Sequence, residues 1–160
     1  MPKYTKVGHV HLNVSDLKRS LRFYTEVMGF HVAGIREPDK AWLSFEPHPP
    51  GMRETFHEIA LTQVPNINRE YWQTTGLNHA AYELASPKDV LEFANDLRAR
   101  NVEIFRGPAT HKGDLTYHIY VRDPDGNAIE VYAKTTDTDV EFRKNIEAAV
   151  PEGYNPYSND

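Results

Sequence analysis

Histidine, tyrosine and glutamate side chains alternate with apolar ones in residues 110–132, THKGDLTYHIYVRDPDGNAIEVY. Because successive residues of a strand point to opposite faces, His118 and Tyr120 share one face, and Glu130 lies opposite its apolar neighbours in the same way. Between the two strand-like runs, residues 123–126 read DPDG, which is typical of a tight turn. The runs are therefore predicted to form a hairpin that carries an imidazole, a phenol and a carboxylate.

Histidines also occupy one face of two further strand-like segments, VGHVHLNV at 7–14 and LNHAAYEL at 77–84. The residues on these polar faces include His9, His11 and Asn13 in the first segment and His79 in the second. The opposite, apolar faces should pack against helices, so the polar faces are expected to point away from them. If the sheets curve into an open trough, these groups converge. Two neutral imidazoles and one carboxylate suit Fe(II) and leave coordination positions for a substrate and O2.

The elements that must position these residues occur twice along the chain. Segments 7–30 and 77–102 each begin with a short histidine-containing strand and continue into a helical pattern. Three strand-like runs follow each helix: HVAGI, AWLSF and HEIALT in the first half, and VEIF, LTYHIYV and NAIEVYA in the second. Both halves therefore read β-α-β-β-β. This pattern predicts an α+β fold in which two modules pair their mixed sheets around an open metal-binding trough.

Each helix has its own start signal. Ser15 or Asp16 can cap the first helix, and Gly29 ends it. Ser86 can cap the second helix, and Pro87 suits its first position. Apolar residues at helical spacing form the predicted buried faces, namely Leu17, Leu21, Tyr24 and Met28 in the first helix and Leu91, Ala94 and Leu97 in the second.

The predicted domain organisation follows from the repeat. Residues 1–135 are expected to form one domain, with module one at 5–64 and module two at 76–133, joined by a polar loop. Residues 136–160 are expected to form a C-terminal helix and tail. That helix has a capping-box pattern at Thr138–Glu141 and a stop at Pro151.

Composition excludes several classes of protein. The chain has 160 residues, no cysteine, and 18 basic against 23 acidic side chains, which gives a net charge of −5. The lack of cysteine excludes disulfides, zinc–thiolate sites and thiol nucleophiles. The acidic balance argues against a nucleic-acid partner. No segment has the pattern of a secretory signal or a membrane span, so a cytoplasmic protein without a membrane partner is expected, and homo-oligomer formation is left open.

Taken together, these residues resemble the vicinal oxygen chelate superfamily over roughly residues 5–133. The second half resembles the type I extradiol ring-cleavage dioxygenases. The signature of that family has a histidine, a short spacer, an aliphatic–tyrosine pair, Asp-Pro-x-Gly and a metal-binding glutamate. The matching residues are His111, Ile119–Tyr120, Asp123–Gly126 and Glu130. Ala109 departs from the residues that the signature prefers two positions before His111.

The resemblance implies an activity and a role for each candidate. His9, His79 and Glu130 would be the ligands of Fe(II), and Mn(II) can occupy the same set. The catalytic residues would be His57, as acid/base, with His111 and Tyr120 hydrogen-bonding the bound catecholate. The residues expected to bind substrate are His11, His118, Asn13 and Arg106. A catechol and O2 would give a ring-opened semialdehyde, as in aromatic hydrocarbon catabolism.

Two alternatives stay open at the level of sequence. A lyase, isomerase or thiol transferase on the same scaffold would favour another divalent metal, and glyoxalases of the superfamily have a fourth, carboxylate ligand where this chain has Ala60. A drug-binding protein of the bleomycin-resistance kind would need no metal triad. Taken singly, each candidate also has an ordinary explanation as a surface histidine or glutamate, a packing tyrosine or a solvated arginine.

Overall fold

The computed structural model describes Lys3 and residues 6–48, 57–65, 77–110, 115–136 and 139–144. The chain divides into two compact units, Met1–Arg69 and Glu70–Asp160. Each unit contains a four-stranded mixed sheet and a helix that follows its first strand. The predicted α+β class and the repeated β-α-β-β-β order are therefore confirmed. No helix among the described residues is both long enough and apolar enough to cross a membrane.

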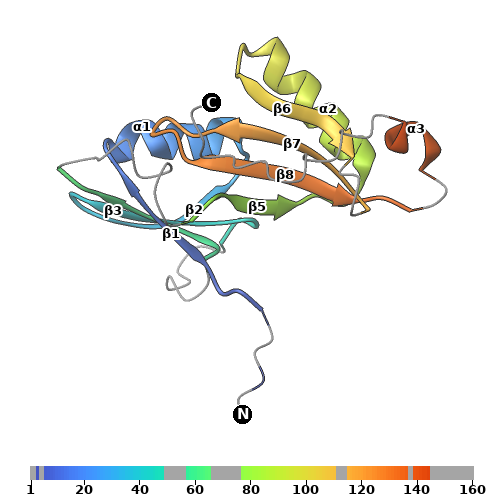
Figure 1. Cartoon of the computed structure of the whole chain (residues 1–160). Helices are drawn as coiled ribbons and strands as arrows, with labels where there is room; N and C mark the ends of the chain where they lie inside the picture. The colour runs from blue at the N-terminus through green and yellow to red at the C-terminus, as the bar shows by residue number, and fades with distance from the viewer. Residues whose placement is uncertain are drawn as a thin grey trace, which may run out of the picture. The chain divides into compact units, whose positions relative to one another are not determined.

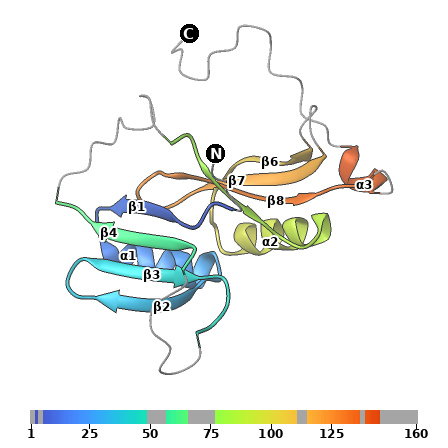
Figure 2. The same cartoon turned by 90° about the horizontal axis from the view of Figure 1, so that it is seen from below.

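The first unit has the strand order β1-β4-β3-β2, with β1 parallel to β4 and the other neighbours antiparallel. Its elements are β1 (Val10–Val14), α1 (Leu17–Arg22), the π-helical turn η1 (Phe23–Val27), β2 (His31–Arg36), β3 (Lys40–Ser44) and β4 (Ile59–Gln63). Figure 2 shows the four strands side by side with α1 on one face of the sheet.

The first helix begins and ends where local signals predict. Asp16 is the N-cap, and its Oδ1 accepts a hydrogen bond of 2.9 Å from the backbone N–H of Arg19. Gly29 adopts a φ of +78°, the left-handed conformation that favours glycine after a helix. The core of the unit is apolar and almost completely buried, and it includes Leu12, Val14, Tyr24, Ala41, Leu43, Ile59 and Leu61.

The register of this sheet decides which side chains share the face opposite the core. His11 pairs with Ala60 in the neighbouring strand, and Ala60 pairs with Trp42 in the next one. Asn13 pairs with Thr62 in the same way. Because residues on one rung of a sheet point to the same side, these side chains lie on one face, while their sequence neighbours fill the core.

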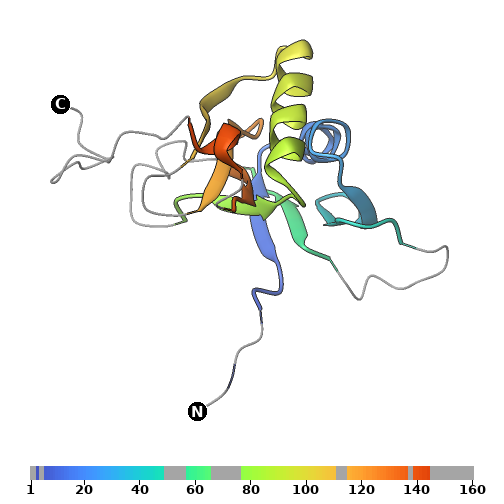
Figure 3. The same ribbon diagram turned by 90° about the vertical axis from the view of Figure 1, so that its right-hand side faces the viewer.

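The second unit has the equivalent strand order β5-β8-β7-β6, with β5 parallel to β8. Its elements are β5 (Ala80–Glu83), α2 (Pro87–Ala99), β6 (Ile104–Thr110), β7 (Thr116–Arg122), β8 (Ala128–Lys134) and α3 (Val140–Arg143). Figure 1 shows α2 running beside β6, β7 and β8, and Figure 3 shows it as one uninterrupted helix. Its buried residues are Pro87, Val90, Ala94 and Leu97.

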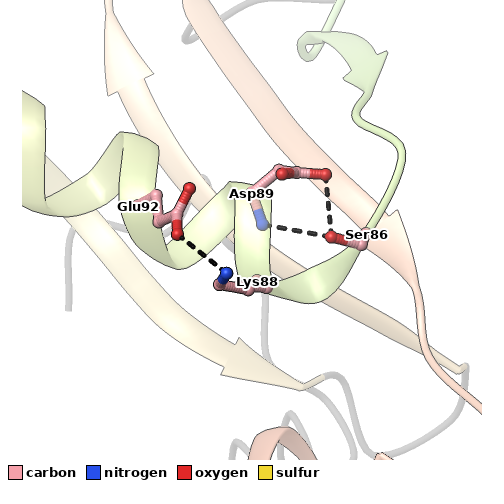
Figure 4. Close-up of polar contacts among 4 residues, drawn as sticks. All are labelled: Ser86, Lys88, Asp89 and Glu92. Atoms are coloured by element: carbon pink, nitrogen blue, oxygen red, sulfur yellow. Dashed lines mark hydrogen bonds and ion pairs between the residues drawn. The ribbon is translucent and has the colours of Figure 1, made fainter.

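The start of α2 is held by the predicted cap (Figure 4). The Ser86 hydroxyl oxygen accepts a hydrogen bond of 3.3 Å from the backbone N–H of Asp89, and the hydroxyl donates to the Asp89 carboxylate at 2.7 Å. Pro87 occupies the first turn, where its missing N–H costs no helical hydrogen bond. Lys88 and Glu92 form an ion pair one turn apart, at 3.4 Å.

Ser86→Ala is expected to lower the free energy of unfolding by about 1 kcal/mol, because it leaves the Asp89 N–H at the helix start without its side-chain acceptor. Urea unfolding followed by circular dichroism measures the change. Ser86→Thr keeps a hydroxyl and should retain most of the stability, so equal losses in both variants would contradict the capping explanation.

The strand β6 extends further than the sequence predicts. The expected strand VEIF ends at Phe105, whereas β6 continues to Thr110 through shifts of register on either side of Arg106. Gly107 allows this bulge: its φ is +81°, and a Cβ there would lie 2.4 Å from the His118 carbonyl oxygen. The sequence pair Gly-Pro is therefore part of an edge strand that approaches β7 closely.

The predicted hairpin between β7 and β8 is confirmed. The buried Asp123 holds its turn, because Asp123 Oδ1 accepts hydrogen bonds from the backbone N–H groups of Asp125 and Asn127 at 2.9 and 2.8 Å. The amide Nδ2 of Asn127 donates to the second carboxylate oxygen at 2.8 Å. This turn fixes the register that sets Tyr120 directly beside Glu130.

A short helix follows the second sheet. α3 begins after Asp139, whose carboxylate accepts hydrogen bonds from Thr136 and not from the helix itself. The Phe142 carbonyl accepts a hydrogen bond of 2.7 Å from Thr110, and its ring packs against Tyr117 with centroids 5.0 Å apart. Thr138, Pro151 and the rest of the predicted tail lie outside the described residues.

Candidate functional site

In the second unit, the predicted ligands His79 and Glu130 are in contact. His79 Nε2 lies 3.0 Å from Glu130 Oε2. The other ring nitrogen, Nδ1, lies 2.8 Å from the side-chain oxygen of Asn78. Nδ1–H can donate to that oxygen, and a metal ion that replaced the direct contact between His79 and Glu130 would then meet the lone pair of Nε2. Such a hydrogen bond behind a histidine is typical of a metal ligand.

The separation of these two atoms fits a shared metal ion. Two donor atoms at right angles in an octahedral site, each about 2.1 Å from the metal, lie about 3 Å apart. The measured 3.0 Å between His79 Nε2 and Glu130 Oε2 agrees with that value. One imidazole and one carboxylate are also the donor types that Fe(II) and Mn(II) accept. The pair therefore fits two positions of the predicted 2-His-1-carboxylate set.

Tyr120 completes the cluster around Glu130. The two residues are register partners on β7 and β8, and a side-chain hydrogen bond joins the Tyr120 hydroxyl to the Glu130 carboxylate. The Tyr120 ring meets those of His79 and His118 edge-on, with centroid distances of 5.4 and 5.3 Å. His118 is fully buried, and Tyr120 is 7% exposed.

These neighbours set the charge of Glu130. Burial alone would raise the pKa of its carboxyl group, because a charged group loses hydration. Three neighbours act in the opposite direction and together hold the pKa of Glu130 below its ordinary value. They are His79, through a hydrogen bond and its positive charge, Tyr120, through its hydroxyl, and His118, through its charge. The carboxylate is thus ionised at neutral pH, which is the form that binds a metal.

Arg106 lies on β6, the edge strand of the second sheet that pairs with β7. It is the register partner of Tyr120, and its guanidinium carbon is 5.3 Å from the centre of the Tyr120 ring. Phe105 also approaches this ring, at 5.9 Å, and Arg122 lies 4.4 Å above the Phe105 ring. The sequence interpretation did not single out Phe105 or Arg122, because their contacts with each other and with Tyr120 depend on the irregular register between β6 and β7.

In the first unit, the predicted ligand His9 lies beside the predicted acid/base His57. Their ring centroids are 4.7 Å apart. His9 immediately precedes β1, and His57 lies just before β4. The Trp42 indole meets the His57 ring edge-on at 6.4 Å. Trp42 was not singled out from the sequence, although the alternation in AWLSF places it on the face opposite the core.

The predicted substrate residues of the first unit occupy the same face. His11 Nε2 lies 2.7 Å from Thr62 Oγ1. Partial desolvation first, and then the charges of Lys40 and His9, lower the pKa of His11 below its ordinary value. Asn13 is exposed beside Thr62. A row of polar side chains therefore runs along this face, and Lys40 lies on the same rung as Asn13 and Thr62.

The structure thus distributes the candidates over both units, with direct contacts between His9 and His57 in the first unit and around Glu130 in the second. His9, His11, Asn13 and His57 belong to the first unit, and His79, Arg106, His118, Tyr120 and Glu130 belong to the second. His111 lies outside the described residues. Within the described part of the chain, no three histidine or acidic side chains are grouped closely enough to hold a metal. The predicted triad takes one ligand, His9, from the first unit and two from the second.

A comparison with known protein families identifies the family of this chain. A sequence profile described as the Glyoxalase/Bleomycin resistance protein/Dioxygenase superfamily matches residues 6–131. The chain belongs to this superfamily. The predicted superfamily is therefore confirmed, and the match covers both repeated modules.

Similar members of the superfamily have different activities in their names. The chain is 32% identical to a lactoylglutathione lyase of Haemophilus influenzae, over 78% of this chain and 90% of the lyase. It is 28% identical to biphenyl-2,3-diol 1,2-dioxygenase 3 of Rhodococcus globerulus, over 79% of this chain and 62% of the dioxygenase. The chain therefore matches less than two thirds of that dioxygenase, and membership alone does not select a reaction.

A solved structure supports the fold. Virulence protein STM3117 of Salmonella typhimurium is 28% identical to this chain in sequence, over 79% of this chain and 82% of that protein. Its crystal structure superposes with a TM-score of 0.58 at 23% identity, covering 84% of this chain and all of the other. At this level of identity, the likeness shows the fold alone, and the chemistry has to be argued from the side chains.

Proposed function

We propose that the protein is an Fe(II)-dependent extradiol dioxygenase. It would insert both atoms of O2 into a catechol, breaking the ring bond beside the two hydroxyl groups and giving a ring-opened semialdehyde. The observation that carries the proposal is the contact of Tyr120 with Glu130: a phenol hydrogen-bonded to an ionised carboxylate that also touches His79. A phenol at this place can hold a catecholic oxygen next to a metal.

In this proposal, His9, His79 and Glu130 hold the metal, and Mn(II) could replace Fe(II). When bound, the metal supplies a template that brings the two catecholic oxygens and O2 together. The protein adds charge and orientation. The ionised Glu130 supplies one negative charge, and Asn78 fixes the orientation of the His79 ring.

The other candidates would bind the substrate and handle protons. Tyr120, together with His111, would hydrogen-bond one catecholic oxygen and assist ketonisation of the product. His57, whose ring lies beside that of His9, would hold a proton and deliver it during cleavage. The residues that would line the substrate side are His11, Asn13, His118 and Arg106.

A lyase or isomerase reaction is the second candidate, because a lactoylglutathione lyase is among the similar proteins. One residue argues against it. Ala60, at the position where glyoxalases of the superfamily would have a carboxylate ligand, offers no oxygen donor and is 2% exposed beside His11. A three-ligand set keeps more positions open for a chelating substrate and O2. A drug-binding protein that holds no metal would not need the cluster of Tyr120, Glu130 and His79.

The decisive test is anaerobic reconstitution with Fe(II), followed by air and a panel of catechols. Oxygen uptake equal to the substrate consumed, together with a yellow ring-cleavage product, is expected. Protein loaded with Mg(II) is the control and should consume no oxygen. Isomerisation of the methylglyoxal–glutathione hemithioacetal by Ni(II)- or Zn(II)-loaded protein, with no oxygen uptake from any catechol, would favour the lyase reaction instead.

Tyr120→Phe is expected to lower kcat by about 100-fold and to change KM much less, because the hydroxyl acts on the reacting oxygen. Steady-state oxygen uptake measures both constants. Tyr132→Phe is a matched control, since the Tyr132 hydroxyl donates to the Glu83 carboxylate at 3.2 Å on the surface of the same sheet. Wild-type turnover in Tyr120→Phe would return this residue to a packing role.

A further inference from the structure

Trp42 has an unusual setting on the first sheet. It lies in β3 between Ala41 and Leu43, which are completely buried in the core, whereas Trp42 is only partly buried. Alternation along the strand therefore places the indole on the opposite face, the face that carries His11. A large aromatic side chain that stays partly exposed retains apolar surface that a ligand can cover.

The side-by-side neighbours of Trp42 are small. Its register partners are Ala60 on β4 and Gly34 on β2. A methyl group and a hydrogen atom stand at the two positions where larger side chains would flank the indole along this rung of the sheet. The small neighbours thus leave space on both sides of the indole ring. This space lies on one face of the first sheet.

The indole also lies next to the proposed chemistry. Its ring meets the His57 ring edge-on at 6.4 Å, and the His57 ring lies 4.7 Å from that of His9. A flat molecule beside Trp42 would therefore approach the proposed proton donor and a proposed metal ligand together. Aromatic rings prefer offset-stacked or edge-to-face contacts, and such contacts add specificity beyond the area that they bury.

We propose that Trp42 is a specificity residue that contacts the ring of a planar aromatic substrate and favours it over an aliphatic thiol conjugate. This inference rests on the proposed function, because it names the substrate class of the same site. Extra aromatic area on the substrate should strengthen the contact, so an aryl-substituted catechol is expected to bind more tightly than catechol itself.

Fluorescence tests the contact without turnover. The chain has two tryptophans, so Trp72→Phe leaves Trp42 as its single indole. Fe(II)-loaded protein is titrated under nitrogen with 2,3-dihydroxybiphenyl and, separately, with S-hexylglutathione, and free N-acetyltryptophanamide corrects for absorption of light by the ligands. Saturable quenching by the catechol in Trp72→Phe, and its loss in Trp42→Phe, is expected. Quenching no stronger than that of the free indole would overturn the proposal, as would an equal response to the thiol conjugate.

Kinetics supply a second readout. Trp42→Ala is expected to lower kcat/KM for 2,3-dihydroxybiphenyl by about 10-fold, and Trp42→Phe, which keeps an aromatic ring, should recover most of the loss. Equal kcat/KM in wild type and Trp42→Ala would reject only the specificity role of Trp42, and the proposed dioxygenase reaction would stand. Saturable quenching by the catechol without oxygen uptake in the wild type would reject the dioxygenase and leave Trp42 as an aromatic-binding residue.

Discussion

Glu130→Gln should lower the affinity for Fe(II) by at least about 100-fold and abolish ring cleavage. Loss of a group that only supports a metal ligand already costs about 10- to 100-fold in affinity, so loss of a ligand charge should cost more. Glutamine keeps the shape and the hydrogen-bonding oxygen beside His79 and Tyr120, and the fold should persist. Iron content after anaerobic reconstitution and gel filtration, together with oxygen uptake, measures the effect.

The structure offers a matched control for this substitution. Glu83 lies on the same sheet and pairs with Lys134 at 3.0 Å, yet it is not part of the cluster around Glu130. Glu83→Gln removes the same charge and a surface ion pair, which contributes at most about 1 kcal/mol to stability, and it should retain iron and activity. A full complement of iron in Glu130→Gln would refute the assignment of this carboxylate as a ligand.

His57→Phe should retain Fe(II) and lose between about 100- and 10,000-fold in turnover, the range expected when a general acid or base is removed. Phenylalanine keeps an aromatic ring against His9 and Trp42, so packing is preserved while both ring nitrogens are lost. Retained iron separates this effect from that of a metal ligand. Single-turnover mixing of the anaerobic substrate complex with oxygenated buffer measures the rate of cleavage itself.

His31→Phe is the corresponding control, because His31 is an exposed histidine at the start of β2. It should cleave substrate at the wild-type rate. Should His57→Phe also match the wild type, His57 would have no part in the mechanism. Loss of iron in His57→Phe would instead indicate that this residue holds the metal site together.

Short-range signals in the sequence determined most of the architecture. The caps at Asp16 and Ser86 and the DPDG turn are correct because each involves groups within four residues of one another. The hairpin that this turn closes also brings Tyr120 and Glu130 together, since its register follows from the turn. The sequence also predicted which side chains share a face of each strand, because alternation along a strand is a local property.

Contacts between distant segments required the tertiary structure. The extension of β6 depends on how closely Gly107 approaches β7, and a Gly-Pro pair by itself reads as a loop. The complete burial of His118 depends on how other parts of the molecule cover it, which alternation does not reveal.

The environment of Trp42 depends on three elements at once, because Gly34, Ala60 and His57 come from β2, β4 and the segment before β4. The sequence by itself therefore determined the repeated fold, its superfamily and the residue types of the candidate site. Only the tertiary structure decided which of them touch, because contact between side chains far apart in the chain is set by strand register and packing, not by local pattern.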